Sequence, residues 1–189
     1  MKTPYAVNML SAAEYGIHCL IVYPDLTTLR EFYSHYIQRQ VEVRNEAVKM
    51  ASFYETLDSV RRTLSGVHGS MDVGRLERER TLAIVDSLNE YFADGECAKF
   101  DLDDYKRMIG DAKALGKSGC SVLGDTGAFP YEGRTRDLVE YEMFMPSRFD
   151  VDMKGICLYH QQDFNRLAAE QKKKLAEHHG MAMRIVQRK

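Results

Sequence analysis

Hydrophobic positions along this chain fall into short continuous apolar runs, separated by longer segments in which apolar residues recur at helical spacing. The runs have the length of β-strands, and several are continuous rather than alternating, as expected for strands buried on both faces. They cover residues 17–23, 47–54, 81–87, 119–123, 155–159 and 181–186. The intervening helical segments are predicted at residues 26–37, 56–64, 102–115, 135–145 and 164–179.

Strands that alternate with helices of this length require crossover connections, which favour a mainly parallel sheet with helices on both sides. A chain of 189 residues suits one such domain. We therefore predict a three-layer α/β sandwich, with residues 1–15 as an N-terminal extension and residues 16–189 as a single domain.

Ligands of open parallel sheets usually bind beyond the carboxyl ends of the strands. This rule selects segments that each follow a predicted strand: residues 23–28, 53–56, 86–91, 124–129 and 159–162.

The first strand-turn-helix unit occupies the position where many nucleotide-binding proteins carry a glycine-rich phosphate loop. Here the turn is YPDLTT, without glycine or lysine. Thr28 and Glu31 have the spacing of a capping box, which would satisfy the start of the helix internally. We expect Tyr23, Asp25 and Thr28 to form the rim of a pocket instead of a phosphate site.

The run LAIVDS resembles a Walker B strand, and its Asp86 is a candidate ligand of Mg²⁺. Many parallel strands end in aspartate for structural reasons, and no Walker A loop accompanies this one. A structural role is favoured, although an atypical nucleotide-binding protein stays an alternative.

The loop GDTGAFP places Asp125 and Phe129 after the fourth predicted strand. Asp125 is either a polar contact for a ligand beside Phe129 or part of a tight turn, and the two readings are equally favoured. Glu142 lies among apolar neighbours in LVEYEMF and needs a partner if it is buried. Arg134 or Arg136 can pair with Glu142 or with Glu140.

Composition narrows the function classes. The net charge of −2 gives no general attraction to nucleic acid or to an anionic membrane, and no apolar stretch approaches the roughly 20 residues needed to span a bilayer. We therefore expect a cytoplasmic protein that binds neither nucleic acid nor membrane directly. Cys19, Cys120 and Cys157 lie in predicted strands and are expected to be buried, reduced thiols.

Cys157 and His160, with Cys19 and Cys120 on neighbouring strands, offer thiolate and imidazole ligands for a metal. Buried structural cysteines are far more common, so no metal site is predicted. Motifs of nucleophilic or paired-acid catalysis are lacking from the sequence. We predict no catalytic residues and a non-enzymatic role, and the sequence leaves the cofactor unknown.

The order of these motifs resembles the MEDS sensory domain, named for methanogen and methylotroph regulators such as the dichloromethane-responsive repressor. The resemblance rests on HCLIVY, LAIVDS, GDTGAFP, DLVEYE and ICLYHQQDF, and it spans residues 16–186. It implies a RecA/KaiC-like core whose phosphate loop is degenerate. It also implies a sensor of small molecules, hydrocarbon derivatives among them, in a transcriptional or two-component system.

Individual residues match the family pattern. His18 and Tyr23 match its first strand, and Glu142 matches the acid of its "eyE" helix. Cys157, Tyr159 and Phe164 match its C-x-Y…F pattern. Asp125 stands where the family usually has glutamate, and His160 stands where an acid is common.

The resulting prediction is a sensory module that binds a small molecule at the carboxyl edge of its sheet. Since residues 16–186 fill nearly the whole chain, we expect output through a regulatory partner protein or a homodimer. A protein-interaction scaffold is a further alternative. The candidate ligand-binding residues are Tyr23, Asp25, Thr28, Asp86, Asp125, Phe129, Glu142 and His160.

Overall fold

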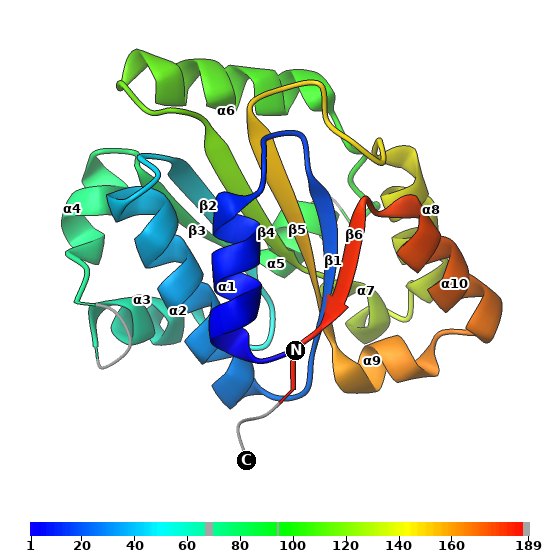
Figure 1. The fold of residues 1–189 in the computed structure, drawn as a ribbon. Helices are drawn as coiled ribbons and strands as arrows, with labels where there is room; N and C mark the ends of the chain where they lie inside the picture. Colours follow the sequence, from blue (N-terminus) through cyan, green and yellow to red (C-terminus); the bar gives the residue numbers. More distant parts are fainter. Residues whose placement is uncertain (67–69, 94, 187–189) are drawn as a thin grey trace.

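A six-stranded parallel sheet forms the centre of the computed structural model, which describes residues 1–66, 70–93 and 95–186 (Figure 1). The strand order is β3-β2-β4-β5-β1-β6, and every neighbouring pair of strands is parallel. The predicted fold class is confirmed. The strands are β1 (His18–Tyr23), β2 (Ala47–Ser52), β3 (Leu82–Asp86), β4 (Cys120–Asp125), β5 (Met153–His160) and β6 (Met181–Arg184).

Helices cover both faces of the sheet and complete the three layers. One face carries α1 (Thr3–Ala12), α2 (Leu26–Glu42), α3 (Leu57–Ser65) and α4 (Val73–Arg78). The other face carries α5 (Ser87–Phe92), α6 (Leu102–Ala114), α7 (Ala128–Tyr131), α8 (Thr135–Phe144), α9 (Gln161–Arg166) and α10 (Ala169–His178). Each face has its own hydrophobic core.

Alternation along β1 and β5 decides which side chains can meet. Cys19 and Ile21 point into the core under α1–α4, whereas Leu20 points into the core under α5–α10. Cys157 on β5 is the register partner of Leu20, so it lies on the α5–α10 face as well. His18 begins β1 on this same face.

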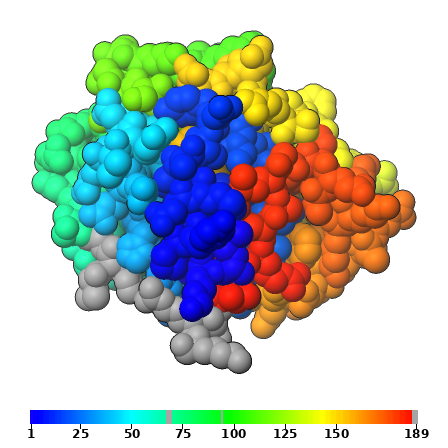
Figure 2. Space-filling model, in the orientation of Figure 1, coloured from blue at the N-terminus to red at the C-terminus, as the bar shows by residue number. Residues whose placement is uncertain are grey.

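The N-terminal helix packs against the domain. Ala6 and Leu10 of α1 are fully buried in the core shared with α2. The Met1 ammonium donates to the carbonyl of Arg184 at 3.0 Å. In Figure 2, α1 (dark blue) lies between the light-blue residues and the red C-terminal segment.

The predicted helix over residues 164–179 is wrong, because two helices occupy this region. The chain is extended at Leu167, which buries its side chain between α9 and α10. The Gln171 side chain accepts from the backbone N–H of Ala168 and so caps the second helix. Asp163 lies inside the first turn of α9 rather than at a cap. Apolar periodicity did not reveal this break, because Leu167 is buried in either arrangement.

Other expectations are met in part. Asp101 caps α6 by accepting from the backbone N–H of Asp103, and Gly116, with φ of +77°, follows the end of this helix. The loop after β4 contains the short helix α7 instead of a turn alone. Within the described ranges, no helix is long and apolar enough to cross a bilayer.

A buried ion pair joins two strands at the amino-terminal end of the sheet. Lys154 Nζ of β5 lies 2.9 Å from Glu46 Oε1, and both side chains are at most 1% exposed. Burial lowers the pKa of Lys154, while Glu46 opposes this effect. Ser121 donates to Glu46 at 2.6 Å. Removing one charge of such a pair leaves the other buried and uncompensated.

We predict that Lys154→Met lowers the free energy of unfolding by about 3 to 5 kcal/mol, since Glu46 loses its buried cation. The exposed pair of Lys173 and Glu177 supplies the control. Lys173→Met should change stability by about 1 kcal/mol or less. Denaturant unfolding monitored by circular dichroism measures both. Equal effects of the two substitutions would contradict this account of the ion pair.

Candidate functional site

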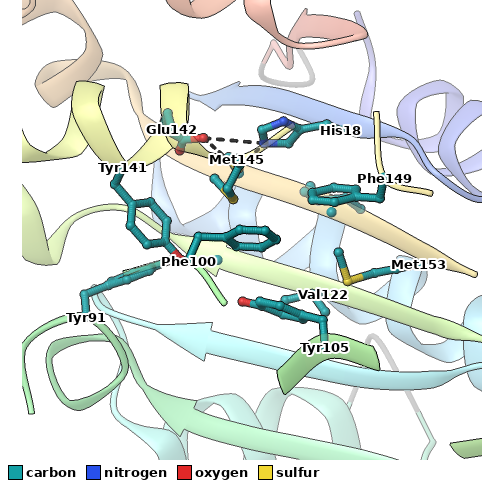
Figure 3. A pocket seen from close by; sticks show the side chains of 14 residues that line it. His18, Tyr91, Phe100, Tyr105, Val122, Tyr141, Glu142, Met145, Phe149 and Met153 are labelled. Atoms are coloured by element: carbon teal, nitrogen blue, oxygen red, sulfur yellow. Dashed lines mark hydrogen bonds and ion pairs between the residues drawn. The ribbon is translucent and has the colours of Figure 1, made fainter. Parts of the chain in front are cut away.

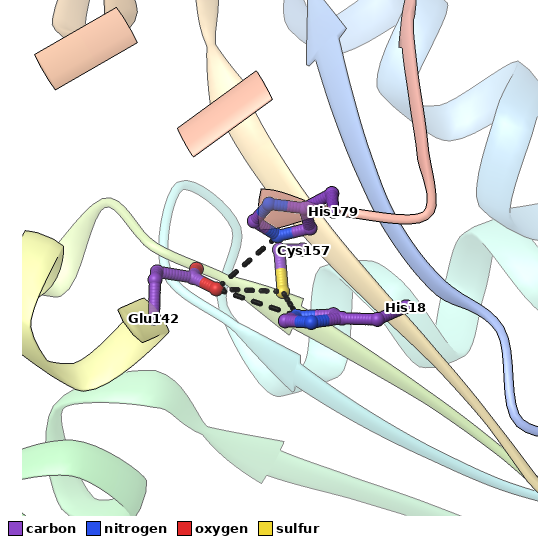
Figure 4. Close-up of side chains that lie close together, drawn as sticks. All are labelled: His18, Glu142, Cys157 and His179. Carbon is purple, nitrogen blue, oxygen red and sulfur yellow. Dashed lines mark hydrogen bonds and ion pairs between the residues drawn. The ribbon is translucent and has the colours of Figure 1, made fainter. Parts of the chain in front are cut away.

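Four buried side chains converge between the sheet and the helices α8 and α10. His18 begins β1, Cys157 lies within β5, Glu142 is on α8, and His179 directly follows α10. Figure 4 shows the four side chains pointing toward one another. One ligand-type atom from each residue lies within 4.8 Å of the other three. We call His18, Glu142, Cys157 and His179 the buried cluster.

Glu142 Oε2 is the atom that the other three residues approach. It lies 3.5 Å from His18 Nε2 and 3.3 Å from His179 Nε2. It is also 3.3 Å from the thiol of Cys157, which donates to it. His18 Nε2 and Cys157 Sγ are 3.3 Å apart. The cluster is therefore compact, and its centre is rich in lone pairs.

The outer atoms of the cluster are held by hydrogen bonds. His18 Nδ1 lies 3.0 Å from the carbonyl of Pro146, and His179 Nδ1 lies 2.7 Å from that of Leu175. A carbonyl only accepts, so Nδ1 of each imidazole carries a proton and Nε2 faces the centre of the cluster, where it donates to Glu142 when the ring is protonated and offers a lone pair when the ring is neutral. Tyr159 donates its hydroxyl to Glu142 Oε1 at 2.8 Å.

Electrostatics keeps Glu142 ionised in this site. Burial alone raises the pKa of its carboxyl, but the imidazoles of His179 and His18 outweigh burial and hold the pKa below the usual range. Burial raises the pKa of the Cys157 thiol, and the neighbouring Glu142 raises it further. Burial lowers the pKa of His18. A carboxylate in this core requires compensating positive charge.

A cavity of about 40 Å³ adjoins the buried cluster, and His18, Glu142 and Cys157 are among its lining residues. Figure 3 shows His18 and Glu142 at one end of it. A water needs about 10 to 15 Å³ of such volume, so this cavity has room for about three water-sized groups. The rest of the lining includes the aromatic residues Tyr91, Phe100, Tyr105, Tyr141 and Phe149 beside aliphatic, methionine and glycine positions.

Two strand glycines make room for these rings. A Cβ at Gly124 of β4 would lie 2.4 Å from the hydroxyl oxygen of Tyr91. A Cβ at Gly155 of β5 would lie 2.6 Å from a ring carbon of Phe149. Both distances are far shorter than any contact between non-bonded atoms. A larger residue at either position would therefore require the ring of Tyr91 or Phe149 to move.

Several residues predicted from the sequence meet at the carboxyl edge of the sheet. Tyr23 donates to Asp125 Oδ2 at 3.4 Å, and the backbone N–H of Tyr54 lies 3.5 Å from the same oxygen. The ring of His160 is 5.4 Å from Tyr23 and 5.0 Å from Tyr54, between centroids. Tyr54 also donates to Asp163. Tyr23, Asp125 and His160 are thus brought together, and we call them the carboxyl-edge group.

Other candidates have local structural roles. The predicted capping box of Thr28 and Glu31 is wrong, since Asp25 caps α2 by accepting from the backbone N–H of Thr28 at 2.8 Å. Asp86 likewise caps α5, at 3.1 Å from the N–H of Asn89. Phe129 is fully buried and packs against Tyr91 in the core, 4.9 Å between centroids.

Glu142 is buried, as its apolar neighbours indicated, but its partners are the buried cluster instead of an arginine. Arg136 pairs with Glu140 at 2.8 Å, which was one of the predicted options. Cys157 does not join His160, because residues three apart on a strand point to opposite faces. The cysteines of the strands are free thiols.

The family model of the methanogen/methylotroph, DcmR sensory (MEDS) domain matches residues 17–179. This chain belongs to the MEDS family. The matched segment begins just before His18 and ends at His179, so it contains the whole buried cluster.

Solved structures place the MEDS chain among RecA/KaiC-like folds. A KaiC-like protein of the hyperthermophilic archaeon Pyrococcus horikoshii OT3 is similar to it, with a TM-score of 0.56 and 16% identity. The match covers 90% of this chain and 72% of that protein. At this identity the likeness shows the fold alone. No curated protein matches the chain.

Sequence reasoning on this MEDS domain missed His179 and most of the aromatic wall. His178 and His179 stand side by side before Gly180, and their order alone does not decide which of them faces the sheet. His178 instead binds the carbonyl of Met145 at 2.7 Å. The wall residues come from segments far apart in the sequence, so no local pattern joins them.

The carboxyl-edge group of the MEDS domain gives a pH prediction. Burial raises the pKa of Asp125 from 3.8 to about 7, and backbone N–H groups of Gly127 and Tyr54 limit the rise. The folded state therefore binds this proton more tightly than the unfolded state does. Its contribution to stability is greatest below about pH 4 and is lost as pH rises to about 7, by roughly 4 kcal/mol.

Asp125→Asn should remove this loss, so the difference in unfolding free energy between the wild-type protein and the variant should fall between pH 4 and pH 7. Denaturant unfolding across that range measures it. Asp58→Asn, at a side chain 80% exposed, is the control and should leave the pH profile unchanged. Parallel profiles of the wild-type protein and Asp125→Asn would refute the raised pKa.

Proposed function

We propose that this sensory domain binds a small, mostly apolar molecule in the cavity lined by Tyr91, Phe100, Tyr105, Tyr141 and Phe149. The observation that carries the proposal is the pairing of an aromatic wall with a polar end made by His18, Glu142 and Cys157. Apolar pockets with a few convergent polar groups are the usual form of small-molecule sites. Membership of the MEDS family supports a sensory role.

The dimensions of the cavity limit the ligand. A volume of about 40 Å³ suits about three non-hydrogen atoms unless side chains move. The aromatic wall favours hydrocarbon-like groups, whereas the polar end favours one group that accepts or donates a hydrogen bond. We therefore propose a small hydrocarbon derivative with a single polar substituent as the chemical class.

The carboxyl-edge location of a ligand, expected from the sequence, stays a prediction, and Tyr23, Asp125 and His160 are the residues that would test it. The alternative of a nucleotide-binding protein has less support. Asp25 places its carboxylate on the N-terminus of α2, where a phosphate loop would present its amides to phosphate. Asp86 is engaged in capping α5.

Signal output is proposed to pass to a regulatory partner protein through α8. Glu142 and Tyr141 of this helix line the cavity, and Phe144 at its end is 70% exposed. A ligand that displaces Tyr141 would therefore move a helix whose outer surface carries an exposed aromatic ring.

Filling the cavity tests the binding proposal. Val122 of β4 lines the cavity, and Val122→Leu adds one methylene to a space of about 40 Å³. We expect at least one probe of two to four non-hydrogen atoms, among short alcohols, thiols and halocarbons, to raise the melting temperature of the wild-type protein. Val122→Leu should lose at least half of that rise.

The matched control is Val60→Leu, which adds the same methylene to a fully buried position of α3 on the opposite face. It should lower the starting stability and keep the rise caused by the probe. The proposal is wrong if no probe stabilises the wild-type protein, or if Val122→Leu and Val60→Leu respond alike.

A further inference from the structure

The buried cluster has the dimensions of a tetrahedral metal site. Zinc–ligand bonds of about 2.0 to 2.3 Å imply that neighbouring ligand atoms lie about 3.3 to 3.6 Å apart. The distances from Glu142 Oε2 to His18 Nε2, His179 Nε2 and Cys157 Sγ are 3.5, 3.3 and 3.3 Å. His18 Nε2 and Cys157 Sγ are also 3.3 Å apart. These four distances match that spacing, and the remaining two pairs of ligand atoms lie within 4.8 Å, so the side chains would close around one ion by local adjustment.

Hydrogen bonds already orient the ligand atoms. Histidines that bind a metal usually donate their other ring nitrogen to a carbonyl or carboxylate, which fixes the ring and the tautomer. The carbonyls of Pro146 and Leu175 hold the two Nδ1 atoms in this way, and Tyr159 holds the far oxygen of Glu142. Each donor is thus aimed at the centre before any ion binds.

One atom of the cluster lacks a hydrogen bond. Among the described residues, His179 Nε2 is buried and has no hydrogen-bond partner, although Glu142 Oε2 is 3.3 Å away. A buried polar atom of this kind in a protein core usually binds a water or an ion. A cation at the centre would bind this lone pair and would also compensate the buried carboxylate.

We propose that His18, Glu142, Cys157 and His179 bind one zinc ion through Nε2, a carboxylate oxygen, Sγ and Nε2. Two imidazoles, one thiolate and one carboxylate are ligands that zinc accepts in tetrahedral geometry. Magnesium and calcium bind six or more oxygens, and this cluster offers too few. On binding, the Zn–S bond replaces the S–H bond of Cys157, and the proton passes to the buffer.

This site goes beyond ligand sensing, and either can exist without the other. Its consequence for the fold is direct, because the zinc would join β1, β5, α8 and the residue that follows α10. It would also form the polar end of the cavity, where three of its ligands are lining residues. A ligand bound there would then contact residues held by the metal.

Elemental analysis of the full-length chain tests the proposal. The protein is made in zinc-supplemented medium without a metal-affinity tag, and it is also refolded from guanidinium chloride with one equivalent of zinc, since the site is buried. We expect one zinc per chain in both preparations. Cys157→Ala and His179→Ala should weaken zinc binding more than 100-fold, beyond the effect of losing a residue that only supports a ligand.

Two control variants remove a cysteine and a histidine side chain that lie outside the buried cluster. Cys120→Ala deletes a buried thiol on β4, and His178→Ala deletes the imidazole adjacent to the cluster that binds the carbonyl of Met145. Both should keep one zinc per chain. Zinc that is lost equally in these controls, or retained in Cys157→Ala and His179→Ala, overturns the assignment.

Cobalt substitution keeps the test valid if a variant fails to fold. Wild-type protein refolded with Co²⁺ should show the intense visible bands of tetrahedral cobalt and a thiolate-to-cobalt charge-transfer band. Cys120→Ala should preserve the charge-transfer band. Wild-type protein that contains no zinc and lacks this band refutes the proposal, whatever the variants do. The thermal-shift test of the cavity is unaffected by that result.

Discussion

The buried charge of Glu142 is the constraint on which the rest of the site depends. A carboxylate enclosed by a hydrophobic core requires positive charge or several hydrogen bonds around it. Here His18 comes from β1, His179 directly follows α10, and Cys157 and Tyr159 come from β5. Satisfying one carboxylate therefore fixes α8, the end of α10 and two central strands relative to one another.

The cavity owes its position to the same arrangement. His18, Glu142 and Cys157 belong to the buried cluster and also line the cavity. Gly124 and Gly155 clear the surface of the sheet for the rings of Tyr91 and Phe149. A molecule bound among these rings would lie against the polar cluster, and α8 would connect it to the surface at Phe144. This is the physical basis for the proposed sensory role.

The sequence predicted the sheet well because strands buried on both faces appear as continuous apolar runs. It also singled out Glu142 and Cys157, although the metal set that it considered and did not predict joined Cys157 to His160. The alternation of side chains along a strand excludes that pair. It allows Cys157 to meet His18, which is two residues from Leu20, the register partner of Cys157 on β1. His179 could not be predicted, since its orientation depends on the break at Leu167 and on packing against β1. The turn after β1 was recognised as unlike a phosphate loop, although Asp25 caps the helix in place of Thr28.

Anomalous diffraction at the zinc absorption edge, from crystals of the full chain grown with zinc, tests the central claim most directly. The account predicts one strong peak inside the buried cluster, about 2.0 to 2.3 Å from the two Nε2 atoms, Cys157 Sγ and a Glu142 oxygen. The four side chains in the arrangement described above with no anomalous peak between them would contradict it.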